Sequence, residues 1–194
     1  MLEKKKMPEK KIKTKKIKTK PIGHKFEAIH RSRELAVQFL YSLDIYPAQE
    51  FNSSLELFFN LDEVAKNDAP EIKQRSRNLI LQVWERKNEI DSILLRVVTG
   101  WTPDRMMSVD RTILRLMLLE GFLEKTLPVR SAITEAVRLA DDFGTQNSAR
   151  FINGVMYKVK EFFEQENLRE LASTLDLDLN DKDKKEKNAA GSEE

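Results

Sequence analysis

Apolar residues recur at helical spacing through the middle of the chain, and no stretch shows the alternation typical of a strand. This pattern predicts a first helix from about Lys25 to Tyr46, which stops before Pro47. Further helices are predicted where the pattern continues: 55–61, 71–98, 109–123, 129–143 and 151–163. Six or seven helices in about 145 residues indicate an all-α fold, an orthogonal helical bundle.

Polar residues, proline and glycine mark the ends of these helices. Asp68-Ala69-Pro70-Glu71 has the pattern of a capping box, which would open a helix there. The segment that follows is long for one helix, so we expect a break near Lys87-Asn88. Ser108 is predicted to cap the next helix, Pro128 and Gly144 to bound another, and Asn147 or Ser148 to cap the last.

Two charged residues lie in apolar stripes. On a helical projection Arg33 falls among Phe26, Ile29, Val37 and Leu40, and Glu120 falls in the stripe of Val109, Ile113, Leu116 and Leu123. Because an unpaired charge on a buried face is costly, each needs a partner. We therefore predict a largely buried Arg33–Glu120 ion pair, which withdraws Arg33 from any surface role.

The two ends of the chain carry most of its charge asymmetry. Residues 1–20 hold ten Lys and two Glu, whereas residues 176–194 hold seven acidic residues and four Lys. The sequence thus predicts three parts: a basic disordered arm (1–22), a helical domain (23–167) and a mostly disordered tail (168–194). A basic arm of this kind favours a polyanionic partner, most often nucleic acid, although it can also serve only as a solubilising segment.

The sequence contains few residues or motifs typical of catalysis or metal binding. It has no cysteine, its only histidines are His24 and His30, and its six glycines occur singly, so no phosphate-binding loop is present. Two histidines without cysteines are a poor metal site, and we expect no metal, no cofactor and no catalytic residue. The apolar runs are too short for a bilayer span and no secretory signal is evident, so we expect a cytoplasmic protein.

Three blocks in the chain resemble the NusB transcription antitermination family. Residues 30–41 read His-Arg-Ser-Arg-Glu-Leu-Ala-Val-Gln-Phe-Leu-Tyr, similar to the opening helix of that family. Residues 109–116, Val-Asp-Arg-Thr-Ile-Leu-Arg-Leu, resemble its Ile-Leu-Arg helix. Residues 128–155 resemble its Pro, Ile-Asn-Glu-Ala, Phe-Gly and Phe-Val-Asn-Gly-Val pattern, with Thr134 where Asn is usual. The family's arginine run is reduced here to Arg31 and Arg33, and the resemblance accounts for neither tail.

The resemblance implies an all-α protein of bacterial type that binds boxA-type single-stranded RNA together with NusE, a small-subunit ribosomal protein. It implies antitermination during ribosomal RNA transcription, with the RNA polymerase elongation complex as an indirect partner. The sequence leaves open whether the free protein forms a homodimer.

Residue chemistry places RNA contacts at two helix starts. Lys25 and Arg31 supply cations at the first, and Gln146, Asn147, Ser148 and Arg150 supply amides, a hydroxyl and a cation at the last. The same polar residues could instead simply cap the helix. Phe162, Phe163, Trp84 and Trp101 are interpreted as core residues, and Gly154 as a position of close helix packing.

Two other functions remain open from sequence. The fold also occurs as the N-terminal domain of a ribosomal RNA cytosine methyltransferase, so the chain could be a stand-alone RNA-binding relative of that domain. It could also be a helical protein-interaction module.

Overall fold

The computed structural model describes the backbone of residues 22–46, 50–98 and 106–190. It describes the side chains of residues 26–46, 50–98 and 106–170, apart from 62 and 65. Within these ranges the chain is helical and forms no strand, which confirms the all-α prediction. The helices are α1 (Ile22–Ile45), α2 (Phe51–Asn60), α3 (Asp62–Asn67), α4 (Pro70–Glu85), α5 (Lys87–Val97), α6 (Ser108–Leu118), α7 (Val129–Phe143) and α8 (Ser148–Ala190). A single π-helical turn, η2 (Leu119–Leu123), continues α6.

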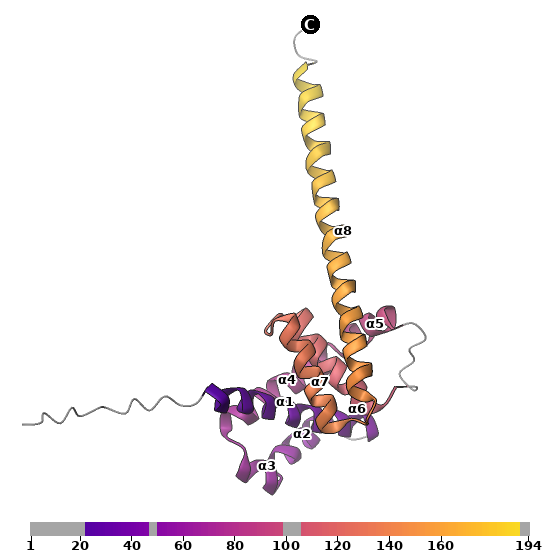
Figure 1. Cartoon of the computed structure of the whole chain (residues 1–194). Helices are drawn as coiled ribbons and strands as arrows, with labels where there is room; N and C mark the ends of the chain where they lie inside the picture. The colour runs from indigo at the N-terminus through magenta and orange to yellow at the C-terminus, as the bar shows by residue number, and fades with distance from the viewer. Residues whose placement is uncertain (1–21, 47–49, 99–105, 191–194) are drawn as a thin grey trace, which may run out of the picture.

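Helix α6 is the centre of the fold (Figure 1). It packs against α1, α4, α5, α7 and α8, and its apolar side chains are buried on several sides. Ile113, Leu114, Leu116 and Met117 are fully excluded from solvent. A helix that is buried on several sides is a core helix, and the five helices named above cover α6.

The helix boundaries differ from the predicted ones in one instructive place. Helix α4 begins at Pro70 as expected, but its N-terminus has no side-chain cap. Asp68, the expected capping residue, is buried and instead accepts two hydrogen bonds from Arg31 of α1. The capping-box prediction was therefore wrong, because a charged partner on another helix binds the carboxylate more strongly than backbone amides do. The predicted break near Lys87 is confirmed, since α4 ends at Glu85 and α5 begins at Lys87.

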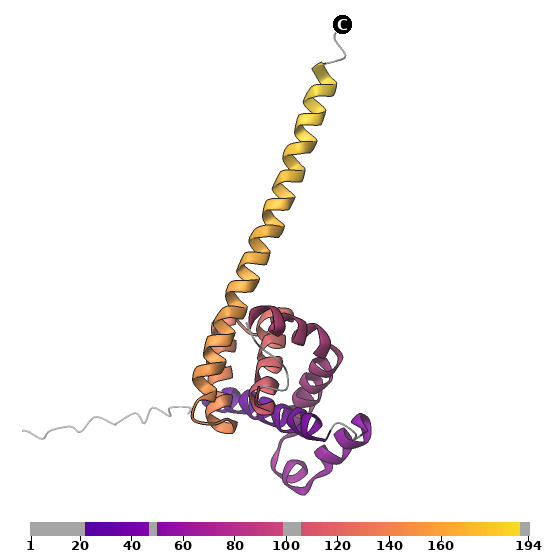
Figure 2. The ribbon, with the colours of Figure 1, turned by 90° about the vertical axis from the view of Figure 1, so that its right-hand side faces the viewer.

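The last helix is much longer than predicted. Helix α8 continues to Ala190 and projects away from the other helices in both ribbon views (Figures 1 and 2). The sequence predicted a mostly disordered tail from residue 168. The structure gives the backbone as helical through Ala190, and the disorder of the tail stays a prediction. No glycine or proline occurs between Gly154 and Gly191, and i,i+3 and i,i+4 pairs such as Glu166–Arg169 and Lys160–Glu164 support the helix.

The predicted ion pair between Arg33 and Glu120 is confirmed. The Arg33 Nε donates to Glu120 Oε2 at 2.6 Å and its Nη2 donates to Oε1 at 3.1 Å, with side chains only 5% and 2% exposed. This bidentate contact ties α1 to η2. Burial alone would lower the pKa of Arg33, but the hydrogen bonds and the charges of Glu120 and Glu135 outweigh it and raise that pKa.

Other helices join the same pair. Glu135 of α7 accepts from Arg33 Nη1 at 3.0 Å, and Arg75 of α4 donates to Glu120 Oε1 at 2.7 Å. Glu135 also lies 2.8 Å from the ring Nδ1 of His30, which is buried. One connected network thus links α1, α4, η2 and α7.

A second buried network was not predicted. Arg115 of α6 donates two hydrogen bonds to Asp91 of α5, at 2.7 and 2.8 Å, and also contacts Asp44 near the end of α1. Arg111 joins Asp44 from the same helix. The opposite end of α1 is therefore also fixed by charge.

Among the described helices, none is long and apolar enough to cross a membrane.

Replacing Arg33 by Met should lower the free energy of unfolding by about 3–5 kcal/mol, because Glu120 would keep a buried charge without its bidentate partner. The matched control is Arg138→Met. Arg138 pairs with Glu27, also between α1 and α7, but both side chains are exposed, so the loss should stay below about 1 kcal/mol. Urea denaturation of both variants measures the difference. Equal losses would show that burial of the Arg33 pair has no energetic consequence.

The Glu135→Gln variant should show a stability loss that depends on pH. Burial raises the pKa of Glu135, but the hydrogen bond from His30 and the charge of Arg33 outweigh it, so the pKa lies below its ordinary value. Stabilisation by an acid of lowered pKa is present above the unfolded-state pKa and disappears as the pH falls through the folded-state pKa. We expect a loss of about 1.5–3 kcal/mol at neutral pH, which shrinks on acidification in unfolding curves recorded from neutral to acid pH. A constant difference at every pH would contradict it.

Candidate nucleic-acid interface

The α7–α8 loop is held in a tight, defined shape. A Cβ added to Gly144 would lie 2.4 Å from the Cβ of Ser148 and 2.6 Å from the backbone oxygen of Ala140, so only glycine fits there. The backbone N–H of Thr145 donates to the Ser148 hydroxyl at 2.9 Å, and the N–H of Phe151 donates to the carbonyl of Asn147 at 3.0 Å. These contacts fix the loop and begin α8.

Ser148 belongs to the support of this loop. It is 1% exposed, and its hydroxyl also interacts with the Asp110 carboxyl at the start of α6. Burial raises the pKa of Asp110, with the Ser148 hydrogen bond opposing that rise. A buried hydroxyl with partners inside the protein positions the loop, which supports the capping interpretation of Ser148, and its contact with RNA stays a prediction.

The other three loop residues predicted from sequence face solvent. Gln146, Asn147 and Arg150 are exposed, and they lie within one turn of each other at the start of α8. Helical spacing extends this group along the helix into a set we call the α8 stripe. Its members are Asn147, Arg150, Phe151, Gly154, Tyr157 and Lys158, all exposed.

The aromatic members of the α8 stripe were missed by the sequence analysis. Phe151, where the predicted helix 151–163 begins, is 37% exposed, and Tyr157 within that helix is 51% exposed. Exposed aromatic rings beside cations are the usual platform for unstacked bases. Trp84, interpreted as core, is also partly exposed, at 42%, but its ring stacks on Phe51. Trp101 lies outside the described residues.

Gly154 does not mediate helix packing. An added Cβ there would meet nothing within 4 Å, so the expectation of a close helix contact was wrong. Between the two exposed aromatic residues, Gly154 leaves the backbone of α8 bare toward solvent. A glycine in an exposed helix interior destabilises the helix, and close approach of a ligand to the backbone is a physical reason for it.

A groove of about 410 Å³ runs between α7 and α8 beside the stripe. Arg130 and Thr134 line it from α7, and Asn153, Tyr157 and Lys160 line it from α8. Among the described residues, Arg130, Arg150 and Lys158 form no ion pair. This surface therefore combines unpaired cations, amides and aromatic rings.

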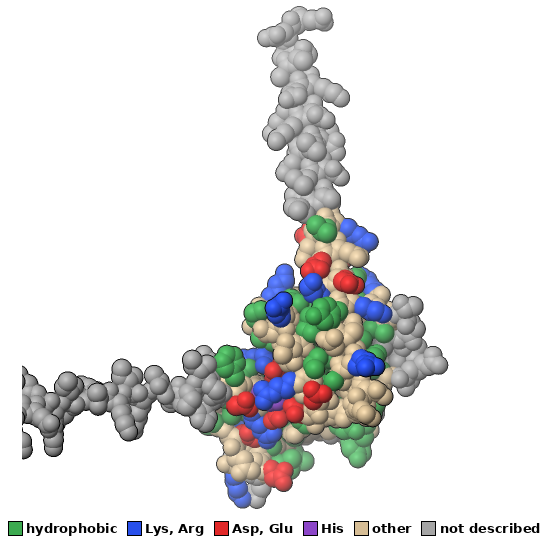
Figure 3. Space-filling view, viewed as in Figure 1, with side chains coloured by type: hydrophobic (Ala, Val, Ile, Leu, Met, Phe, Trp, Pro, Cys, Tyr) green, Lys and Arg blue, Asp and Glu red, His purple; other side chains and the backbone are tan. Residues whose placement is uncertain are grey.

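The start of α1 has a different electrostatic character. Arg31 donates two hydrogen bonds to Asp68, at 2.9 and 3.1 Å, and one to Glu34 at 3.0 Å, which raise its pKa against the effect of burial. Acidic and basic side chains gather side by side over this end of α1 (Figure 3). Lys25 lies in the first turn of α1, where its side chain is outside the described residues.

The two predicted clusters are close neighbours in the fold. His30, next to Arg31, lies 3.0 Å from Asp142, which precedes the α7–α8 loop by only a few residues. The structure therefore places Arg31 and the loop at adjoining surfaces. Of these two surfaces, the one on α7 and α8 carries described cations without an ion pair, Arg130, Arg150 and Lys158, whereas Arg31 is paired.

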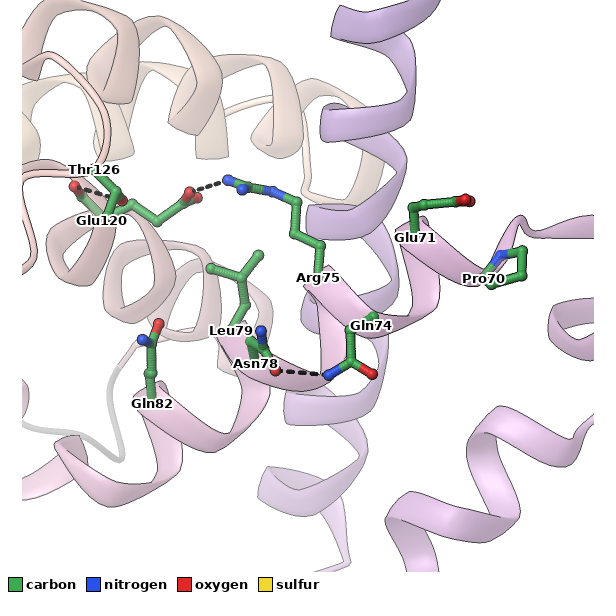
Figure 4. Close-up of a pocket in the computed structure, with 9 residues that line it drawn as sticks. All are labelled: Pro70, Glu71, Gln74, Arg75, Asn78, Leu79, Gln82, Glu120 and Thr126. Carbon is green, nitrogen blue, oxygen red and sulfur yellow. Dashed lines mark hydrogen bonds and ion pairs between the residues drawn. The ribbon is translucent and has the colours of Figure 1, made fainter.

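Two further hollows on the surface are comparable in size to the groove beside the α8 stripe. The polar groove between α4 and η2, about 690 Å³, is lined by Gln74, Asn78 and Gln82, and its arginine, Arg75, is bound to Glu120 (Figure 4). With its cation neutralised, it is less suited to phosphate than the α8 stripe.

The second hollow is apolar and lies where α1, α6 and α7 meet. Tyr41, Ile45 and Met107 line it and are 41–50% exposed. It adjoins the α7–α8 loop through Phe143. Exposed apolar side chains gathered in one place are typical of a protein-binding surface.

The comparisons with known proteins point in one direction. The model of the NusB family matches residues 30–161. The transcription antitermination protein NusB of Carboxydothermus hydrogenoformans is 34% identical over 138 residues, covering 70% of this chain and 94% of that protein. Its counterpart in Desulforudis audaxviator is 36% identical, with 68% and 91% covered.

Solved structures agree in fold. A structure of T. maritima NusB superposes with a TM-score of 0.60 at 29% identity, over 68% of this chain and 89% of that one. A chain in the crystal structure of antitermination factors NusB and NusE in complex with dsRNA gives a TM-score of 0.60 at 20% identity, over 70% and 97%. The second likeness is one of fold alone.

Replacing Gly154 by Ala should stabilise the protein by about 0.5–1 kcal/mol, because alanine favours the helix and the new methyl group meets no neighbour. Thermal unfolding measures this gain. The same variant should bind single-stranded RNA several-fold more weakly, since the methyl group covers the bare backbone between Phe151 and Tyr157. Greater stability with unchanged RNA affinity would exclude a ligand approach at this glycine.

Proposed function

The chain belongs to the NusB family, and on that premise we propose that it is a transcription antitermination factor. It would bind boxA-type single-stranded RNA together with the ribosomal protein NusE, during transcription of ribosomal RNA. The observation that carries the proposal is the α8 stripe, where unpaired cations stand beside exposed aromatic rings at a helix start.

Each part of this surface matches a feature of single-stranded RNA. Arg150, Lys158 and Arg130 would follow the phosphate backbone, and Phe151 and Tyr157 would stack on splayed bases. The amides of Gln146 and Asn147 can donate to and accept from base edges, which is where sequence is recognised. The basic arm, whose predicted disorder falls outside the described residues, would add affinity without selectivity.

Arg31 enters the proposed interface in a different way from Arg150. Its side chain is 35% exposed and its contact with Glu34 is a single hydrogen bond, so a phosphate could replace Glu34 there. Its two bonds to buried Asp68 would remain, and they make Arg31 a residue that supports α4 as well as the RNA surface.

The apolar hollow at α1, α6 and α7 is the proposed site for NusE. It adjoins the α7–α8 loop, so a protein bound there would reach the same RNA segment. A joint surface of this kind fits an RNA that is recognised by two proteins together.

We expect no catalytic activity and a cytoplasmic location. The exposed cations and aromatic rings of the α8 stripe serve binding. The chain contains no cysteine, so it lacks the nucleophile expected of a cytosine methyltransferase. The proposal therefore favours the antitermination factor over the methyltransferase relative, and over a helical module that binds only proteins.

Comparison of Arg150→Ala with Arg31→Ala tests this assignment. For a boxA-like RNA, Arg150→Ala should weaken binding and reduce the slope of log K against log salt by about 0.7, because one phosphate contact is lost. Its melting temperature should stay unchanged, because Arg150 has no partner within the described part of the protein. Arg31→Ala should lower the melting temperature, because buried Asp68 loses both of its hydrogen bonds.

A lysine outside the stripe, Lys73→Ala on α4, is the control for general loss of positive charge. The proposal fails if Arg150→Ala leaves both affinity and salt slope unchanged. Binding of purified NusE, measured separately with Tyr41→Asp, tests the partner surface independently of the RNA.

A further inference from the structure

Three side chains meet where α1 and α7 lie side by side. His30 and Glu34 lie one turn apart on α1, and Asp142 comes from the last turn of α7. The His30 Nε2 is 3.0 Å from Asp142 Oδ2 and 3.6 Å from Glu34 Oε1. The His30 side chain is 5% exposed, whereas that of Asp142 is 42% exposed, so the cluster is open to solvent on one side.

Both ring nitrogens of His30 face carboxylates. Nδ1 lies 2.8 Å from Glu135 Oε1, and Arg33 holds that same oxygen from the other side. A neutral imidazole has one donor and one acceptor nitrogen. With Nδ1–H donated to Glu135, the lone pair of Nε2 points at the oxygens of Glu34 and Asp142, and three acceptors then converge with no hydrogen between them.

Such a convergence of acceptors requires a cation. Among the described residues named below, the ion pairs connected to His30 join five carboxylates and three guanidinium groups, a balance of two negative charges before His30 is counted. The carboxylates are Glu34, Asp68, Glu120, Glu135 and Asp142, and the guanidinium groups are those of Arg31, Arg33 and Arg75.

The spacing suits a metal ion. Ligands about 2.0–2.1 Å from a tetrahedral Zn²⁺ lie about 3.3 Å from each other. The two distances from Nε2 lie on either side of this value, and the three ligand atoms are all within 4.8 Å of one another. The hydrogen bond from Nδ1 to Glu135 is the outer contact that orients a metal-binding histidine and fixes its tautomer.

We propose that His30 Nε2, Glu34 Oε1 and Asp142 Oδ2 bind one divalent transition-metal ion, with Zn²⁺ as the best match, and that this ion joins α1 to α7. One imidazole and two carboxylates form a set of N and O ligands that favours zinc over magnesium or calcium, which prefer oxygen alone. The sequence predicted no metal because two histidines without cysteines are a poor set of ligands. The fold adds the second carboxylate from a helix more than a hundred residues away.

Metal titration of the full chain tests the site. The protein is stripped with a chelator and titrated with Co²⁺, followed by visible absorption, and with Zn²⁺, followed by calorimetry. We expect saturation at one ion per chain. Asp142→Asn should weaken binding at least about tenfold, with a circular dichroism spectrum like that of the parent protein, because this side chain is partly exposed.

Asp141→Asn is the matched control. Asp141 is the neighbour of Asp142 in sequence, its side chain is exposed and lies outside the cluster, and the substitution removes the same charge. It also separates this site from loose binding to the acidic residues 176–194, which neither variant changes. Paramagnetic broadening of one of the two histidine ring signals by Co²⁺, lost in Asp142→Asn, assigns the ligand. Absence of saturable binding, or equal affinity in the Asp141 and Asp142 variants, overturns the proposal and leaves a proton on Nε2 as the cation. Neither titration contains RNA, so failure of the metal proposal leaves the proposed function untouched.

Discussion

The buried contact between Arg33 and Glu120 is the constraint on which the rest of the fold depends. Two buried charges must pair in one geometry. If α1 slid or rotated against η2, the pair would break and leave a buried charge without a partner. Glu135 and Arg75 extend the requirement to α7 and α4. Apolar faces alone would tolerate small shifts of these helices, because hydrophobic contact is not directional. The pair therefore fixes register more than it adds net stability, and the α7–α8 loop takes its position from that register.

Much of this arrangement could be predicted from the sequence, because helical periodicity shows both the apolar faces and the charges that interrupt them. Arg33 and Glu120 were found in this way. Arg115 was not, although it lies between buried Leu114 and Leu116, because a helix that is buried on several sides has no polar face against which a charge looks misplaced. Local patterns also misassigned Asp68. A capping motif predicts that the carboxylate accepts hydrogen bonds from neighbouring backbone amides, whereas in the structure it accepts them from Arg31, which is distant in sequence.

The candidate site was predictable only in part, for a related reason. Polar residues at a helix start indicated Gln146, Asn147 and Arg150, and all three face solvent. Ser148 shares their chemistry but lies under the loop, and no sequence pattern distinguishes a hydroxyl that caps from one that binds. The exposed rings were missed because an aromatic residue in an amphipathic helix is usually core. The residues of the α8 stripe are spaced three and four apart, and this spacing could have indicated that the aromatic rings lie on the same exposed face as Asn147 and Arg150.

The same charges that fix the fold also shape how RNA could approach it. The arginines of α1 are held by carboxylates, and the pairs around His30 leave an excess of negative charge at the junction of α1 and α7. That excess lies beside the proposed RNA surface, where it would repel phosphate over a distance of about one Debye length, some 8 Å. A divalent ion held by His30, Glu34 and Asp142 would cancel it. Metal occupancy and RNA affinity would then be coupled through electrostatics alone, without any movement of the helices, and the coupling would weaken as salt screens both charges.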